Sequence, residues 1–417
     1  MLRLLRIALL IVVAGATAFP QSIETARRVG GPAEVILDAT QQPSPALPPR
    51  EWIEPATGHR VVRLTETPGS ASLYFHQNQY TAAGDKMVFT TREGLSTINL
   101  KTRQIDRIVE GRVGKVIVGS KTRQAFYMID DVVYAADLDS KKARVIATRP
   151  ELRAASGFAV NADETLLAGS YVIDPVPAQA PRPPEPNLIP QNQESNLEAR
   201  WLARRPMRLF TINVNTGEVR TFHPSTDWLN HVQFSPTDPT LLMFCHEGPW
   251  HKVDRIWTIR TDGSELRKVH TRTMEMEIAG HEFFSPDGKT IWYDLQTPKS
   301  QVFWLAGYDV ATGKLTKFKI EREHWSVHFN ASPDGKLFAG DGGGPRSVAA
   351  PGNGQWIYLF TPQRGSLVVE KLVDLSKHDY RLEPNVSFTP DGRWVVFRSN
   401  MHGATHVYAV EVKKERR

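Results

Sequence analysis

The sequence contains one cysteine, Cys245, among 417 residues. A single thiol excludes a framework of intrachain disulfide bonds, so packing alone must hold the fold together. The sequence also has no apolar run of about 20 residues, the length that a helix needs to cross a bilayer. A hydrophobic content of 41% is nevertheless ordinary for a globular protein, and we expect one with a large core.

Signals for nucleic-acid recognition are also missing. The formal net charge is +6 and the isoelectric point is near 9.3, but no basic stripe is interleaved with aromatic residues and no recognition motif is present. We therefore predict no nucleic-acid partner. The positive charge suits an acidic partner instead, although part of it lies in the N-terminal leader and in the tail 413–417.

The N-terminus has the order of a secretory signal. Arg3 and Arg6 precede the apolar run Ile7–Val13, and small residues follow up to Ala18. This order predicts a signal peptide at 1–18 that is cleaved after Ala18. The mature protein is then expected in the periplasm or outside the cell, with no membrane association, and 19–55 is expected to be an irregular lead-in rich in Pro, Ala and Gln.

Helical periodicity is nearly absent from Tyr74 onward, apart from a segment at 194–203. Short β-rich runs alternate with Gly, Pro, Asp and Asn instead, and they recur with a period of about 40 to 50 residues. The repeated units begin at 75–81, 157–163, 231–236, 281–286, 328–335 and 385–392, with a weaker start at 114–118.

Each unit predicts four antiparallel strands. In the fifth unit, the starting run is followed by strand-like runs at 290–294, 301–305 and 314–318. Seven such units predict an all-β fold, a seven-bladed β-propeller that occupies 56–417. The last unit has only three runs, and we expect His59–Leu64 to supply its fourth strand and so close the ring.

The third unit contains a Pro-rich insertion at about 174–205, which we expect to form a loop over one face of the propeller. The glycine-rich stretch Gly340–Pro345 lacks the Lys-Ser/Thr ending of a phosphate-binding loop, which favours a backbone turn. No Gly-x-Ser-x-Gly motif is present and no second domain remains to hold one, which argues against a propeller peptidase.

The starts of the innermost strands should converge on the central channel. A single histidine there is more often structural than functional, but several together indicate a site. The run 244–255 adds two histidines, two acidic residues and an arginine, and loops on a rigid scaffold often carry function. The converging residues are His76, Gln77, His231, His281, His328, Glu383 and Asn385.

Three motifs carry a resemblance to a known family. These are Phe-Cys-His-Glu-Gly-Pro at 244–249, the His-Glu-Phe motif within 279–287, and the Phe-Thr-Pro-Asp run within 384–392. With them the chain resembles the oligogalacturonate lyases from about Tyr74 onward. The resemblance implies a seven-bladed propeller that cleaves short acidic oligosaccharides by β-elimination with a divalent metal, typically manganese.

The resemblance also implies roles for individual residues. His281 falls on the family's catalytic base, Arg255 on its essential arginine and His328 on a metal ligand. Tyr380, Glu383 and Asn385 stand where the family has a glutamine and two histidines. The site implied here is therefore richer in oxygen, with Glu383 and Asn385 as ligands of Mn²⁺ or Ca²⁺. The residues expected to line the sugar site are His231, His246 and Arg381.

Two other functions remain open from the sequence. A non-catalytic exported propeller would bind a glycan or a protein through the same face, without turnover. A purely structural assembly propeller would bind no metal. The altered residues at 380–385 keep the first of these alternatives open.

Overall fold

A computed structural model describes residues 48–173, 193–344 and 354–414. The chain divides into Met1–Leu47 and Pro48–Arg417, and only the second unit contains described residues. The expected signal peptide at 1–18, most of the lead-in and the Pro-rich part of the insertion lie outside the described residues. No helix among the described residues is long and apolar enough to span a membrane.

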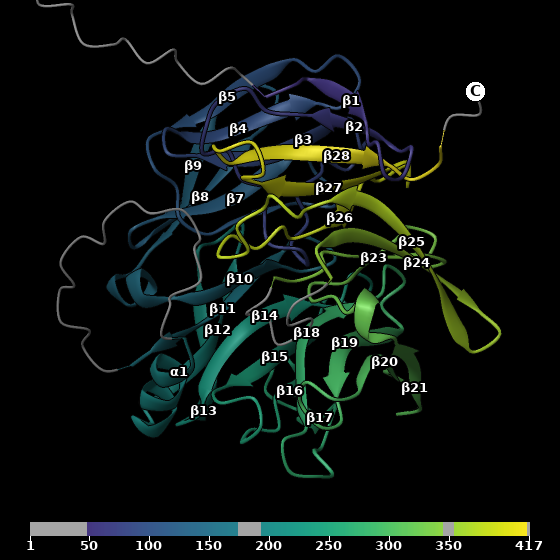
Figure 1. Cartoon of the computed structure of the whole chain (residues 1–417). Helices are drawn as coiled ribbons and strands as arrows, with labels where there is room; N and C mark the ends of the chain where they lie inside the picture. The colour runs from purple at the N-terminus through teal and green to yellow at the C-terminus, as the bar shows by residue number, and fades with distance from the viewer. Residues whose placement is uncertain (1–47, 174–192, 345–353, 415–417) are drawn as a thin grey trace, which may run out of the picture. The chain divides into compact units, whose positions relative to one another are not determined.

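The described chain forms seven antiparallel sheets, which confirms the seven-bladed propeller (Figure 1). Blade 1 consists of β3 (Lys86–Thr91), β4 (Gly94–Asn99) and β5 (Ile105–Glu110). Blade 2 consists of β6 (Val116–Val118), β7 (Gln124–Ile129), β8 (Val132–Asp137) and β9 (Ala143–Thr148). Blade 3 consists of β10 (Ser156–Val160), β11 (Leu166–Val172), β12 (Met207–Asn213) and β13 (Val219–Ser225). Blades 4 and 5 consist of β14 (Trp228–Phe234), β15 (Leu241–Glu247), β16 (Ile256–Arg260), β17 (Arg267–Lys268); and β18 (Ile278–Phe284), β19 (Thr290–Gln296), β20 (Phe303–Asp309), β21 (Leu315–Ile320).

Blades 6 and 7 consist of β22 (Asn330–Ala331), β23 (Phe338–Gly340), β24 (Trp356–Gln363), β25 (Ser366–Asp374); and β26 (Ser387–Phe388), β27 (Trp394–Ser399), β28 (His406–Glu411), β2 (Arg60–Arg63), β1 (Glu51–Ile53). The helices are α1 (Gln193–Leu202) and the short 3₁₀ helices Pro150–Ala154 and Arg322–His324. Helix α1 overlaps the segment 194–203, where the sequence has helical periodicity.

The ring closes through strands from both ends of the described chain. In blade 7, β2 pairs with β28 in antiparallel register, with Val61 opposite Val410, which confirms the predicted closing strand. A fifth strand, β1, pairs with the outer edge of β2. The sheet thus begins at Glu51, inside the range 19–55 that the sequence suggested to be irregular, because β1 is too short and too exposed to leave an alternating pattern.

Blade 1 departs from the four-stranded pattern. Its inner segment forms only isolated bridges, Ala71 with Thr90 and Tyr80 with Met87, beside the three strands β3 to β5. Between these bridges the chain makes a turn, in which the Gln77 N–H donates to the Tyr74 carbonyl over 2.8 Å. The turn leaves Tyr74, Phe75 and His76 near the inner strands of other blades.

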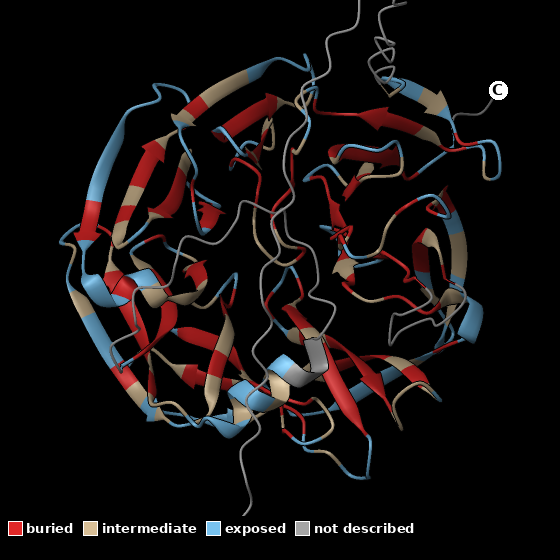
Figure 2. Ribbon diagram, turned by 60° about the vertical axis from the view of Figure 1, so that its left-hand side comes forward, coloured by how far each residue is buried: buried red, intermediate tan, exposed pale blue. Residues whose placement is uncertain are grey.

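Apolar side chains fill the spaces between neighbouring blades. The buried residues form seven clusters, and each cluster joins one blade to the next around the whole ring. The outermost strands, such as β21, are largely exposed (Figure 2). A blade buries its faces only by stacking on its neighbours, so stability depends on a closed ring.

The innermost strands share an unusual backbone conformation. Gly157, His231, His281, His328 and Asn385 occupy the same position in blades 3 to 7, and all five have positive φ angles between 39° and 68°. The pairing register shifts at this position in blades 3, 4 and 5, as expected at a β-bulge. Such a conformation costs about 1–3 kcal/mol for a residue other than glycine, and strain of this kind clusters at functional sites.

The closing strand gives a test of the fold. Val61→Asp places a charge at a position with 0% exposure between β2 and β28. An uncompensated buried charge costs about 3–5 kcal/mol, so urea denaturation should show a loss of this size. Val368→Asp, at a position with 51% exposure in β25, is the matched control and should leave stability unchanged. Equal stability of the two variants would contradict the closure through β2.

The positive φ angle at His281 gives a second test. His281→Gly should be more stable than His281→Ala by about 1 kcal/mol, since the left-handed conformation costs a residue with a Cβ atom about that much. Both variants lose the same side-chain contacts, so their difference reports the backbone. Thr290 in β19 has an extended backbone and serves as the control position. There Thr290→Gly should be less stable than Thr290→Ala by about 0.5–1 kcal/mol, because glycine is the poorer residue inside a strand. Chemical denaturation of the four variants measures both differences.

Candidate functional site

Three histidines from three blades meet around a tyrosine from blade 1. The ring centroids of His281 and His328 are 4.4 Å apart. The ring of Tyr74 lies 5.4 Å from that of His328 and 5.7 Å from that of His231. Burial and the charge of Glu383 raise the pKa of Tyr74 well above its ordinary value, so its phenol keeps its proton. The predicted convergence of strand starts is therefore present.

His281 is oriented by a carboxylate on the next strand. Its Nδ1 lies 3.0 Å from Oδ1 of Asp294 in β19, and Asp294 is 1% exposed. A carboxylate accepts a hydrogen bond, so this contact favours the tautomer with the proton on Nδ1. That tautomer leaves Nε2 with a free lone pair. The side chain of His281 is 11% exposed, whereas that of His328, the equivalent histidine of blade 6, is 1% exposed.

His328 has the same arrangement in blade 6. Its Nδ1 lies 2.8 Å from Oδ2 of Asp341, and the two residues are separated by 13 positions, as are His281 and Asp294. Burial alone would lower the pKa of His328, but the charges of Asp341 and Glu383 raise it above its ordinary value. The glycine-rich stretch is therefore more than the predicted backbone turn, since it delivers the fully buried Asp341 to His328.

Arg255 lies between two buried carboxylates. Its Nε donates to Glu282 over 3.1 Å, its Nη1 donates to Glu247, and only 3% of the residue is exposed. Burial opposes the charge of Arg255, but the acidic groups Cys245, Glu247 and Glu282 raise its pKa well above its ordinary value. Burial likewise opposes the charge of Glu247, yet Arg255 and His231 hold the pKa of Glu247 well below its usual range.

Two further side chains connect this ion network to the histidines. Nε2 of His231 lies 3.3 Å from Oε2 of Glu247. Trp250 donates from Nε1 to Oε1 of Glu247 over 3.3 Å, and its ring lies 5.1 Å from the ring of His281. The guanidinium of Arg255 lies 5.2 Å from the centre of the same indole. Trp250 therefore covers Arg255 and borders His281.

Glu383 and Asn385 approach His328 from blade 7. Oε2 of Glu383 lies 3.7 Å from Nε2 of His328, too far for a hydrogen bond, and that nitrogen is buried without a hydrogen-bond partner. Burial opposes ionisation of Glu383, but His328 and Arg398 keep its pKa below its ordinary value. The amide of Asn385 donates to the Glu383 carbonyl over 3.2 Å, and its oxygen accepts from the Phe75 N–H over 3.2 Å.

This donor set fits a divalent metal ion. An imidazole nitrogen without a partner and an ionised carboxylate face each other at a distance that one ion would bridge. Asn385 lies beside them, with its Nδ2 3.4 Å from Oε2 of Glu383 and its oxygen bonded to the Phe75 N–H. The oxygen-rich character expected from the sequence at 383–385 is thus compatible with a hard cation.

A second group of ligand atoms belongs to His231, Cys245 and Glu247, which lie within 4.8 Å of one another. It is poorly suited to a cation. Burial raises the pKa of the Cys245 thiol well above its ordinary value, and Arg255 already neutralises Glu247. We assign no metal to this group.

Two residues expected at the sugar site lie apart from the cluster. His246 follows Cys245 in β15 and points to the opposite face of the blade from Glu247, where its ring lies 4.9 Å from that of Trp257. Burial lowers the pKa of His246 to about 4. The side chain of Arg381 is 47% exposed, and its Nε donates to Asp379 over 2.7 Å.

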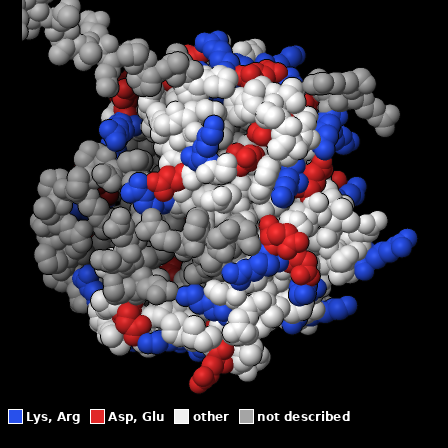
Figure 3. Space-filling model, viewed as in Figure 1, with Lys and Arg blue, Asp and Glu red and all other residues white. Residues whose placement is uncertain are grey.

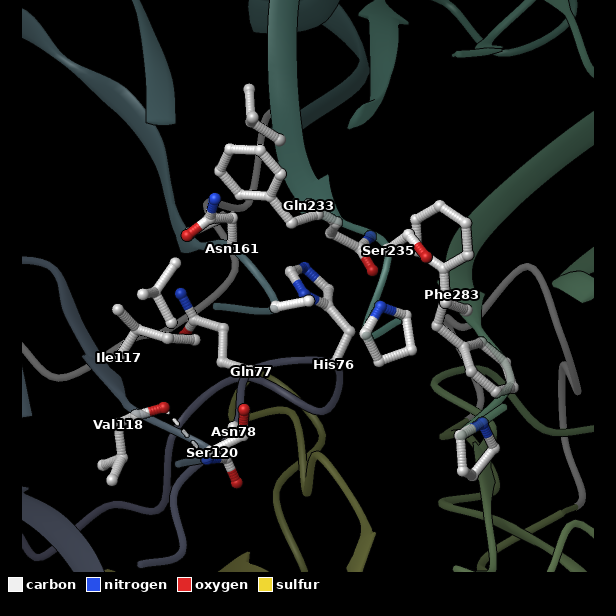
Figure 4. Close-up of a pocket in the computed structure, with 18 of the residues that line it drawn as sticks. His76, Gln77, Asn78, Ile117, Val118, Ser120, Asn161, Gln233, Ser235 and Phe283 are labelled. Atoms are coloured by element: carbon white, nitrogen blue, oxygen red, sulfur yellow. Dashed lines mark hydrogen bonds between the residues drawn. The ribbon is translucent and has the colours of Figure 1, made fainter. Parts of the chain in front are cut away.

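A cavity of about 200 Å³ lies along the inner strands, and His76 is the histidine in its lining. Its polar lining is uncharged and includes Gln77, Asn161 and Gln233, grouped with His76 around the space (Figure 4). His76 connects the cavity to the cluster, because its ring lies 5.0 Å from that of Tyr74. Burial and the neighbouring His231 lower the pKa of His76 well below its ordinary value.

Surface charge does not single out the site. On the face seen in Figure 3, the Lys and Arg side chains lie among acidic ones rather than in one stripe. On this face, therefore, positive charge gathers in no single patch that would mark a site for an acidic ligand.

Sequence reasoning overlooked the carboxylates that orient the site. Asp294, Asp341 and Tyr74 were not among the candidate residues, whereas Glu247, Trp250 and Glu282 lie in stretches that the sequence singled out, without a role of their own. One signal was present, since a carboxylate follows both His281 and His328 after 13 residues. The ion network around Arg255 leaves no such spacing, because it joins residues of different blades.

Comparisons with known proteins agree on one family. A model of the oligogalacturonate lyase family matches residues 49–415. The chain is 27% identical over 383 residues to an oligogalacturonate lyase of Dickeya dadantii, covering 85% of this chain and 94% of the relative. It is 26% identical over 384 residues to an oligogalacturonide lyase of Pectobacterium atrosepticum, covering 86% and 94% of the two chains.

A solved structure of an oligogalacturonate lyase in complex with manganese superimposes with a TM-score of 0.74 at 25% identity, covering 87% of this chain and 96% of that one. Sequence, structure and family model therefore coincide over nearly the whole described chain. The protein belongs to the oligogalacturonate lyase family.

Proposed function

We propose that this chain is a lyase that cleaves oligogalacturonate, or a related uronate oligosaccharide, by β-elimination. The observation that carries the proposal is the pair His281–Asp294, an imidazole with a free Nε2 beside the ion network of Arg255. Family membership supports the same chemistry. The reaction removes the proton at C5 of a uronate and expels the oxygen at C4.

His281 is the base. A neutral imidazole has an ordinary pKa of about 6.5, which suits proton abstraction near neutral pH. Asp294 holds the ring in one orientation and stabilises the imidazolium that forms when Nε2 takes the C5 proton. The left-handed backbone at His281 directs this side chain out of the strand pairing and toward the channel.

Arg255 contributes a fixed positive charge. Because Arg255 is 3% exposed and already pairs with Glu247 and Glu282, it acts through its charge and by anchoring Glu282, which adjoins His281. His231 lines the sugar site beside Trp250. His246 and Arg381 lie apart from this cluster, and we do not include them in the sugar site.

The residues that would hold a divalent metal are His328, Glu383 and Asn385. When bound, such an ion neutralises the substrate carboxylate and so acidifies the proton at C5. Manganese is the ion we favour, by likeness to the manganese complex of the related lyase. The oxygens of Glu383 and Asn385 also suit calcium.

Export is part of the same proposal. The charged, apolar and small-residue regions of 1–18 support a cleaved signal peptide and a location in the periplasm or outside the cell. An acidic oligosaccharide is a plausible substrate in such a compartment.

The activity has a direct test. Purified protein incubated with oligogalacturonates and Mn²⁺ should form an unsaturated product that is followed by ultraviolet absorbance. His281→Ala should lower kcat by about 10²-fold or more, since general-base catalysis contributes about 10²–10⁴-fold. His402→Ala, which removes an exposed histidine of blade 7, is the control and should keep wild-type activity. Binding of uronate oligomers without any product would instead favour the non-catalytic propeller.

The metal assignment has a separate test. Electron paramagnetic resonance of Mn²⁺ titrated with the protein should show binding that weakens by about 10-fold or more in His328→Ala, since a ligand is lost. His246→Ala removes a histidine on the opposite face of β15 and should bind Mn²⁺ like the wild type. Equal binding by all three proteins would exclude His328 as a ligand.

A further inference from the structure

Tyr74 places a free hydroxyl group inside the histidine cluster. Its hydroxyl makes no hydrogen bond among the described residues, and it is absent from the fully buried polar atoms that lack a partner, so its oxygen is not completely enclosed. The ring contacts both His328 and His231, and the phenol experiences the charges of Glu383 and Arg255. A proton donor therefore lies against His328, whose ring is 4.4 Å from that of His281.

We propose that Tyr74 is the general acid of the elimination, which donates its hydroxyl proton to the oxygen that leaves C4. The inference rests on the lyase function proposed above. The acid and the base then come from different blades. His281 takes a proton from carbon, and Tyr74 gives a proton to oxygen. A phenol is protonated at neutral pH and so holds a proton that it can give to the leaving oxygen.

The structure holds Tyr74 rigidly. Its backbone N–H donates to the Gln77 side chain over 3.3 Å, and its carbonyl accepts from the Gln77 N–H over 2.8 Å. Phe75, the next residue, is bound on both sides, because its N–H donates to Asn385 over 3.2 Å and its carbonyl accepts from Asn330 over 3.0 Å. Blades 6 and 7 thus fix the turn that presents Tyr74, as an acid that must meet one oxygen requires.

Other donors near the cluster are already engaged or unsuited. His231 faces Glu247 over 3.3 Å, and Arg255 is enclosed by Glu247 and Glu282. Glu383 is ionised beside His328 and accepts protons rather than donating them. Among the described residues in contact with His231 and His328, Tyr74 keeps a hydroxyl that makes no hydrogen bond and is not completely enclosed.

The step balances as follows. Nε2 of His281 takes H5, the C5–H electron pair becomes the C4=C5 double bond, and the C4–O bond breaks with its electron pair going to oxygen. That oxygen takes the Tyr74 proton and leaves as an alcohol. The tyrosinate recovers a proton through water from the imidazolium of His281, so no oxidant or other co-reactant is needed.

The test compares two leaving groups. Tyr74→Phe removes only the hydroxyl, and Tyr134→Phe in blade 2 is the matched control. Both are assayed on oligogalacturonate, whose leaving alcohol needs a proton, and on a methyl galacturonide that carries 4-nitrophenoxide at C4, which leaves without one. Tyr74→Phe should lose about 10²-fold or more of kcat on oligogalacturonate and little on the nitrophenyl compound. His281→Ala should lose activity on both.

Two results would overturn the role of Tyr74 while leaving the lyase function intact. These are an unchanged rate of Tyr74→Phe on oligogalacturonate, and an equal loss on both compounds, which would mark a structural role. A folded wild-type protein without activity on either compound would refute the lyase function itself, and the role of Tyr74 with it.

Discussion

The stacking of blade on blade is the constraint on which the rest of the structure depends. Each blade is a small sheet that cannot bury both faces alone, and the seven apolar clusters join neighbouring blades, with Phe75 of blade 1 added to the cluster between blades 5 and 6. An open ring would expose the faces at its two ends, so β2 must join β28 across the gap in blade 7. Closure also brings the inner strands around one channel, and a site built at their starts needs no further element to assemble it.

The innermost strands share one backbone arrangement, but the residue at its left-handed position differs from blade to blade. In blades 3, 4 and 5, one residue of the innermost strand pairs with the second strand, and the residue after it has a positive φ. The paired residues of the second strand are Ser170 in blade 3, Cys245 in blade 4 and Asp294 in blade 5. The left-handed position holds glycine in blade 3 and histidine in blades 4 and 5. Only the pairing of histidine with a carboxylate orients an imidazole, as His281 and Asp294 show. Strain of about 1–3 kcal/mol at such a position is tolerated because the closed ring stabilises the strands on either side.

The sequence predicted most of the propeller fold but fewer of the contacts between the residues of the site. The repeat of about 40 to 50 residues and the missing fourth strand of the last unit were sufficient for the propeller and its closure. The strand β1 and the irregular inner segment of blade 1 were not predicted, since short exposed strands and turns leave no periodic pattern. His281, His328 and Glu383 were recognised as converging residues, but Arg255 pairs with Glu247 of its own blade and with Glu282 of the next, and alternation along one strand carries no information about such contacts.

The charges of the site argue for a cation at Glu383. The family pattern has a histidine at this position, whereas this chain places an ionised carboxylate 3.7 Å from His328. A uronate substrate brings further negative charge to the same place, and Arg255 is already balanced by two carboxylates. Arg398 donates to the Glu383 carbonyl over 2.7 Å and offsets only part of this charge. We propose that a polyanion binds here once positive charge is added, as a divalent ion held by Glu383 and His328 would supply.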